Sequence, residues 1–183
     1  MLLAIDPGTV TGVAWDVDGH VEYATWQLGM DTDKRLLRLA DNLTDILGNH
    51  ACRHLAYEEP YVGPFKNAAE SLFAQRGIIR YIAARMCIPA HGYSPREIKM
   101  GIAGGKATKD QMIDAIKARG YSPANEHEAD AIALLLLMRT GTLPMEGTRK
   151  AAVRQQRKKV VDLFSKSTVR RITKKTRSNA KIA

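Results

Sequence analysis

Cysteine, aromatic side chains and long hydrophobic runs are all scarce in this chain of 183 residues. Its two cysteines, Cys52 and Cys87, show neither metal-binding nor redox spacing, so we expect two reduced and largely buried thiols in a cytoplasmic protein. The longest apolar run, ADAIALLLLM, is too short to cross a bilayer. The first residues form a strand pattern that contains an acid, and we therefore expect no secretory signal peptide.

Acidic residues are nearly absent from the last part of the chain. Residues 149–183 contain 13 of the 28 lysines and arginines and only one acid, Asp162, so this segment carries +12 and the remainder −3. Such a segment is typical of polyanion binding, in which counterion release from phosphates supplies affinity without reading sequence. The alternative is a solvated tail that only improves solubility. Apolar residues such as Val160 and Phe164 favour instead a short helix that folds on nucleic acid or on the body of the protein.

This contrast in charge predicts a division of the chain into two parts. Residues 1–145 have an ordinary apolar content and should form one folded domain, whereas residues 146–183 should form a basic extension that binds nucleic acid. Within the extension we expect three neighbouring basic side chains to contact phosphates: Arg157, Lys158 and Lys159.

The hydrophobic periodicity of the domain predicts an α/β fold with a mixed five-stranded sheet and helices on both faces. Three antiparallel strands should occupy residues 1–28, and two later strands, reached by crossovers, should run parallel. A helix that stops at Gly48 should follow the first three strands. The remaining expected elements are a strand at 54–60, a helix at 68–87, a strand at 88–95, two helical pieces within 96–120 and a helix within 125–141.

Three acids stand at the ends of these elements: Asp6, Glu58 and Asp130. Functional groups collect at the carboxyl ends of parallel strands, so Asp6 and Glu58 should meet if their strands are neighbours. Carboxylates brought together repel each other, and a hard divalent cation such as Mg²⁺ or Mn²⁺ relieves the repulsion. Two such ions roughly 4 Å apart can hydrolyse a phosphodiester. Each acid taken alone is more typical of a surface residue or a helix cap.

Several segments, in this order and spacing, resemble the RuvC-type Holliday junction resolvases of the RNase H-like superfamily. They are AIDPGTVTGVAW, LAYEEPYVGPFKN, QRGI, YSPREIKMGIAGGKATKDQM and HEADAIALLL, which together span roughly residues 1–140. The basic extension falls outside the match. The resemblance implies an RNase H-like nuclease domain over residues 1–145. It also implies two Mg²⁺ ions per active site, for which Mn²⁺ should substitute.

The resemblance also implies roles for individual side chains. The implied metal ligands are Asp6, Glu58, His127 and Asp130. Glu126 lies four residues before Asp130 and shares its helix face, so it remains a rival to His127 as a ligand. Glu59 should point to the opposite face of its strand from Glu58 and take no part.

Basic and aromatic side chains complete the implied site. Lys99 and Lys109 match basic residues near the scissile phosphate, where a lysine offsets the charge that builds up on phosphorus. Neutralisation of the DNA backbone is an equally open role for Lys99, as it is for Lys106. Tyr61 matches an aromatic residue that stacks on a base, and Phe65 in the same loop could do the same. Lys66 should contact the DNA beside them. Gly12, which lacks a side chain, should leave room for a phosphate backbone.

The implied activity is that of a Mg²⁺-dependent crossover-junction endodeoxyribonuclease, a homodimer that makes symmetric paired nicks in four-way junctions and leaves 5′-phosphate and 3′-hydroxyl ends. The helix at 68–86 is the candidate dimer interface. Three alternatives stay open: a nuclease that cuts branched DNA broadly, an RNA-processing RNase H-like nuclease, and a non-catalytic junction-binding protein. We expect the protein in the cytoplasm, at a bacterial nucleoid or in a phage-infected cell. No membrane contact is expected, and the sequence does not identify a helicase partner.

Overall fold

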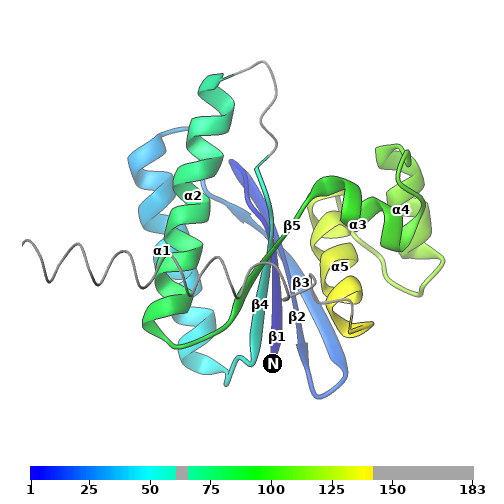
Figure 1. The fold of residues 1–183 in the computed structure, drawn as a ribbon, viewed down its shortest axis with the longest axis horizontal. Coiled ribbons are helices and arrows are strands. Elements are labelled where there is room, and N and C mark those ends of the chain that lie inside the picture. Colours follow the sequence, from blue (N-terminus) through cyan, green and yellow to red (C-terminus); the bar gives the residue numbers. More distant parts are fainter. Residues whose placement is uncertain (61–65, 142–183) are drawn as a thin grey trace, which may run out of the picture. The chain divides into compact units, whose positions relative to one another are not determined.

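A computed structural model describes the backbone of residues 1–60 and 66–141, and the side chains of the same residues except 66–68 (Figure 1). Five of the predicted DNA contacts lie outside the described residues: Tyr61, Phe65, Arg157, Lys158 and Lys159. Lys66 begins a helix, but its side chain also lies outside the description. Among the described helices, none is long and apolar enough to span a membrane.

The elements follow the predicted order. They are β1 (Leu2–Asp6), β2 (Val10–Val17), β3 (His20–Gln27), α1 (Thr32–Asn49), β4 (His54–Glu58), α2 (Lys66–Arg85), β5 (Ala90–Tyr93), α3 (Pro95–Ile102), α4 (Lys109–Lys117) and α5 (Glu126–Arg139).

The five strands form one sheet in the order β3-β2-β1-β4-β5. The first three strands pair antiparallel, whereas β4 pairs parallel with β1 and β5 pairs parallel with β4. This confirms the predicted mixed sheet. It also makes β1 and β4 direct neighbours, so the carboxyl ends that carry Asp6 and Glu58 lie side by side.

Alternation of residue size along the strands separates two hydrophobic cores, since successive side chains point to opposite faces. The larger residues Leu3, Ile5 and Leu55 pack in one core with α1 and α2. Ala4 and Ala56 pack in the other core with α3, α4 and α5. Figure 1 shows these two groups of helices on opposite sides of the sheet. The small residues on the second face let α5, which is apolar on most of its surface, pack close to the strands.

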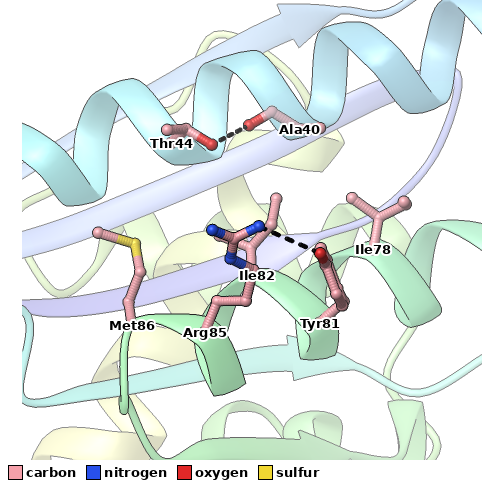
Figure 2. A pocket seen from close by; sticks show the side chains of 7 residues that line it. All are labelled: Ala40, Thr44, Ile78, Tyr81, Ile82, Arg85 and Met86. Carbon is pink, nitrogen blue, oxygen red and sulfur yellow. Dashed lines mark hydrogen bonds between the residues drawn. The ribbon is translucent and has the colours of Figure 1, made fainter.

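A groove of about 450 Å³ lies between α1 and α2 (Figure 2). Tyr81 of α2 lines it with 57% of its surface exposed, and Met86 with 39%. The guanidinium of Arg85 lies 5.9 Å from the centre of the Tyr81 ring and donates a hydrogen bond of 3.3 Å to its hydroxyl. The groove is therefore an apolar surface with a charged rim on the face of the molecule away from α5.

Three local expectations were wrong. Helix α1 continues through Gly48 to Asn49, because its buried leucines hold the helix against the sheet whatever the propensity of one glycine. Cys87 is exposed, and not buried, because it follows the end of α2 in the turn toward β5 with a φ of 57°. Cys52 is only partly buried.

Candidate active site

A cavity of about 180 Å³ brings together side chains from four elements of the domain. Glu58 enters it from the end of β4 and Asp130 from the first half of α5. Lys99 of α3 and Lys109 of α4 line the same cavity. Four of the six side chains predicted to be catalytic therefore share one cavity, although 72 residues separate the two acids along the chain.

Asp6 belongs to this group through its position in the sheet. It ends β1, directly beside the strand that Glu58 ends. Its carboxylate influences the pKa of both Glu58 and Asp130, which places the three acids within electrostatic reach of one another.

The backbone of α5 comes very close to the sheet at Gly12. This residue pairs with Asp6 of β1 on one side and with Thr25 of β3 on the other. A β-carbon at position 12 would overlap the carbonyl oxygen of His127. The expectation that Gly12 leaves room for a phosphate backbone was therefore wrong, because the first turn of α5 fills that space.

The first turn of α5 also brings His127 to Asp6. Nδ1 of the imidazole lies 3.1 Å from Oδ2 of the carboxylate. With a proton on Nδ1 donated to Asp6, the lone pair on Nε2 faces away from that bond. Nε2 lies 3.9 Å from Oε1 of Glu126.

Glu126 forms an ion pair with Lys109. Its Oε2 lies 2.6 Å from Nζ of Lys109, and the hydrogen bond from this lysine lowers the pKa of the Glu126 carboxyl. The same bond raises the pKa of Lys109. Both side chains are well exposed, so the pair adds little to stability, but it holds the ammonium group at the edge of the cavity.

Burial and mutual repulsion shift the titration of the three carboxyl groups. Burial, followed by the charges of Asp6 and Asp130, raises the pKa of Glu58 to about 8, while Lys99 opposes the shift. Burial and the charge of Asp6 raise the pKa of Asp130 to about 6. Burial also raises the pKa of Asp6, and the contact with His127 only partly offsets this. The site therefore concentrates more negative charge than the protein alone stabilises.

The chemistry of this donor set suits a divalent cation. Carboxylate oxygens are the ligands that Mg²⁺ and Mn²⁺ prefer, and a cation would relieve the repulsion that raises the pKa values. Among the described residues, however, no three His, Cys, Asp or Glu side chains are arranged to hold a metal ion as they stand. The side chains therefore fit a divalent cation in composition and charge, and they must turn toward the ion in order to bind it.

Glu59 lies on the other face of the sheet, as predicted. Its Oε2 lies 2.9 Å from Nε of Arg76 in α2, and its Oε1 occupies the space left by the missing side chain of Gly92. Lys106, the remaining described residue among the predicted DNA contacts, is exposed between α3 and α4.

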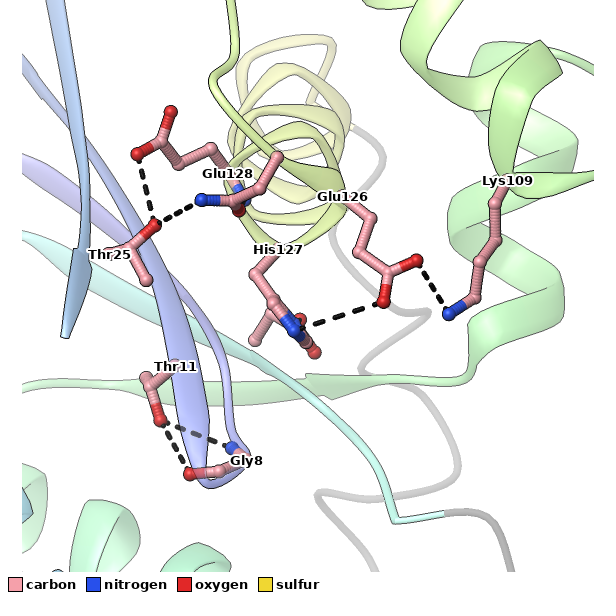
Figure 3. A network of polar contacts seen from close by, with 9 residues as sticks. Gly8, Thr11, Thr25, Lys109, Glu126, His127 and Glu128 are labelled. Atoms are coloured by element: carbon pink, nitrogen blue, oxygen red, sulfur yellow. Dashed lines mark hydrogen bonds and ion pairs between the residues drawn. The ribbon is translucent and has the colours of Figure 1, made fainter. Parts of the chain in front are cut away.

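A hydrogen-bond network at the start of α5 did not emerge from the sequence. It joins Thr25 to Glu128 (Figure 3) and both of them to Asn125. The spacing of Asn125 and Glu128, three residues apart before an apolar run, is an N-terminal helix signal that could have drawn attention to them. Nothing in the pattern of β3 indicates that Thr25 is their partner.

Comparison with known proteins places these features in context. The family model described as "Crossover junction endodeoxyribonuclease RuvC" matches residues 2–137. The protein of that name from Pelotomaculum thermopropionicum is 30% identical over 153 residues, covering 74% of this chain and 90% of the relative. The one from Halorhodospira halophila is 34% identical over 146 residues, covering 74% and 87%.

Solved structures show the same fold. RuvC of Thermus thermophilus superposes with a TM-score of 0.61 at 23% identity, covering 78% of this chain and 97% of the neighbour. The structure titled "T. thermophilus RuvC in complex with Holliday junction substrate" gives 0.62 at 23% identity, covering 78% and 96%. These matches confirm the RNase H-like fold class.

Proposed function

The chain belongs to the RuvC family of crossover junction endodeoxyribonucleases, and from that premise we propose that it resolves four-way DNA junctions by metal-dependent hydrolysis of phosphodiesters. The observation that carries the proposal is the cavity in which Glu58 and Asp130 face Lys99 and Lys109, beside Asp6. Clustered carboxylates that can bind divalent ions, beside basic residues that can face a phosphate, suit a metal-assisted phosphodiesterase.

Family membership makes the enzyme a metal-dependent nuclease. We propose that the ions are two Mg²⁺ per site, with Mn²⁺ able to substitute, and that the ligands are Asp6, Glu58, Asp130 and Nε2 of His127. Bound ions of this kind supply activation of the attacking water and stabilisation of the leaving 3′-oxygen. The bond from His127 Nδ1 to Asp6 supports the assignment of Nε2, because it fixes which ring nitrogen keeps a lone pair.

The lysines act on the phosphate itself in this proposal. Lys99 lines the cavity and lowers the pKa of Glu58 by its charge, so its ammonium group can also offset negative charge on the scissile phosphate. Lys109 is held beside the cavity by Glu126 at 2.6 Å and can exchange this partner for a DNA phosphate. Hydrolysis leaves a 5′-phosphate and a 3′-hydroxyl.

Two of the four strands in a four-way junction are related by two-fold symmetry, and a symmetric dimer would place one active site at each of these two. We propose that α2 supplies the dimer interface. Phe73 and Tyr81 expose 40% and 57% of their surfaces on this helix, and the groove beside Tyr81 offers an apolar surface to a second copy. Its position on the face away from α5 leaves the catalytic cavity open to DNA.

Two assignments outside the described residues complete the proposal. Tyr61 and Phe65 follow Glu58 closely in the chain, which supports base stacking next to the cleaved phosphate. The extension over residues 146–183 would add salt-dependent, sequence-neutral affinity for DNA.

A panel of labelled DNA substrates tests the proposal. It contains mobile and immobile four-way junctions, a Y-fork and a linear duplex, each with and without Mg²⁺. Symmetric nicks in the four-way junctions alone, and only with Mg²⁺, are the expected result. Cutting of every branched substrate would establish the broad debranching alternative, and tight binding without cutting would leave a junction-binding protein.

A further inference from the structure

Three residues lie side by side across the first three strands, under the start of α5. Asp6 of β1 pairs with Gly12 of β2, and Gly12 pairs with Thr25 of β3. The carbonyl group of His127 lies directly over Gly12. The first turn of the helix therefore rests on the middle strand, with a polar side chain of the sheet on either side of it.

Consecutive helix residues bind these two side chains. His127 contacts Asp6 at 3.1 Å. The next residue, Glu128, accepts a hydrogen bond of 3.0 Å from the hydroxyl of Thr25 (Figure 3). Consecutive side chains on a helix point about 100° apart, so one turn can hold both sides of the row at once. The helix start is thus held between β1 and β3.

The contacts of Glu128 leave neither carboxylate oxygen unused. Oε1 accepts from Thr25, and Oε2 accepts a bond of 2.8 Å from the backbone N–H of Ala124. Asn125 closes the network, since its Nδ2 donates to Thr25 Oγ1 at 2.9 Å and its Oδ1 accepts from the backbone N–H of Glu128 at 3.0 Å. Only 8% of Glu128 is exposed. A buried carboxylate with this many partners fixes the geometry around it.

We propose that Thr25, Asn125 and Glu128 are positioning residues that set the place of His127 and Asp130 in the active site. None of the three reaches the cavity or touches the reacting groups. They fix the rotation of the first turn of α5 and its distance from the sheet. Because His127 and Asp130 lie on either side of Glu128 in the chain, the same turn sets where these two side chains stand. This inference rests on the proposed function for its catalytic consequence, but the positioning itself is a property of the free protein.

The alternative is that the network only stabilises the fold. A stabilising role alone would lower the free energy of unfolding and leave the rate of the folded enzyme unchanged. A positioning role lowers the rate of the chemical step in the folded enzyme, since a displacement of about 1 Å in a catalytic group can cost about 100-fold in rate. Junction affinity should not change in either case, because none of the three side chains lines the cavity.

Thr25→Val is the decisive variant, because valine keeps the shape of the side chain and removes the hydroxyl that Glu128 and Asn125 share. Thr25→Ser restores a hydroxyl. Thr140→Val is the matched control, since it removes a hydroxyl that binds the carbonyl of Leu137 at the far end of the same helix. Single-turnover cleavage at saturating Mg²⁺ and junction affinity are measured for each full-length variant. NMR of the ¹⁵N-labelled protein, without metal or DNA, follows the ring N–H signal of His127, assigned by its loss in His127→Gln.

We expect Thr25→Val to cut at least about tenfold more slowly with junction affinity within about twofold of wild type, and Thr25→Ser to recover most of the rate. The His127 ring signal should shift or broaden in Thr25→Val only. Wild-type cutting together with an unchanged His127 signal in Thr25→Val would overturn the inference. If the wild-type protein cuts no junction, the proposed function fails. The NMR comparison then decides the positioning alone: a changed His127 signal supports it, and an unchanged signal overturns it.

Discussion

The imidazole of His127 and the carboxylate of Asp6 lie 3.1 Å apart, although 121 residues separate them in the chain. This contact joins the end of the central strand to the first turn of the last described helix. It can form because Gly12 lets the backbone of that turn approach the sheet. The packing of α5 on the sheet thus brings Asp130 close to Asp6 and Glu58.

Replacing Asp6 by Asn should abolish cleavage and spare binding. The amide keeps the size of the side chain but removes a negative ligand, so we expect the rate to fall at least about 1,000-fold while junction affinity stays within about threefold. Gel assays of cutting and binding at matched Mg²⁺ measure both. Asp16→Asn is the matched control, because this acid pairs with Arg139 at the opposite end of the sheet. Wild-type cutting by Asp6→Asn would refute the role of Asp6.

The metal-free protein should become more stable as the pH falls from 8.5 to 5.5. Glu58 and Asp130 have pKa values raised to about 8 and about 6, so the folded state binds protons more tightly than the unfolded state. Stability from this source is present at low pH and is lost as the pH rises through these values. Calorimetry in EDTA measures the change in Tm. Because the raised pKa of His127 acts in the same direction, Glu58→Gln isolates the contribution of Glu58.

Mg²⁺ should change this pH dependence. Binding requires the ionised carboxylates, so saturating Mg²⁺ should raise Tm more at pH 8.5 than at pH 5.5. An equal increase at both pH values, or the same pH dependence of Tm in Glu58→Gln as in the wild type, would contradict the account of the buried carboxyl groups.

Gly12→Ala should displace the first turn of α5. The added methyl group would overlap the carbonyl oxygen of His127, and the helix must shift outward. We expect the free energy of unfolding to fall by about 1–3 kcal/mol. The cleavage rate should fall by a larger fraction of its wild-type value than the free energy of unfolding does. Gly48→Ala is the control, since a β-carbon there meets nothing within 4 Å and the change should stabilise α1 by about 0.5–1 kcal/mol. Full activity in a folded Gly12→Ala protein would mean that the position of α5 does not matter.

Glu126→Gln should distinguish a lysine partner from a metal ligand. Glu126 holds Lys109 at 2.6 Å, and an exposed pair of this kind contributes less than about 1 kcal/mol. We therefore expect cleavage within about threefold of wild type and an unchanged Mg²⁺ concentration for half-maximal rate. His127→Ala should instead reduce the rate at least about 100-fold. A tenfold rise in the Mg²⁺ concentration for half-maximal rate in Glu126→Gln would instead make Glu126 the metal ligand in place of His127.

Much of the site could be predicted because two of its acids, Asp6 and Glu58, stand at the ends of strands. The alternating pattern placed Asp6 and Glu58 at the carboxyl ends of two strands, and the pairing of β1 with β4 brings them together. The resemblance of residues 1–140 to a known family added His127 and the two lysines. Glu126 stayed ambiguous, since residues three and four apart share a helix face and spacing alone cannot choose between them.

The remaining features depend on contacts between helix and sheet that no local pattern encodes. The sequence shows that position 12 has no side chain, but the docking of α5 on the sheet decides which atoms fill the space beside it. The bond between Thr25 and Glu128 spans 103 residues and follows from the same docking. The passage of α1 through Gly48 reflects burial of its leucines, which outweighs the low helix propensity of one residue.

Cleavage of a cruciform on a supercoiled plasmid tests the central claim most directly. Paired nicks across the junction by a dimer linearise the plasmid, whereas a single nick gives an open circle. We expect linear product with wild-type protein and Mg²⁺, open circles when wild-type protein is mixed with an excess of Asp6→Asn, and no cutting in EDTA. Mg²⁺-independent cutting, or linear product undiminished by the inactive variant, would contradict it.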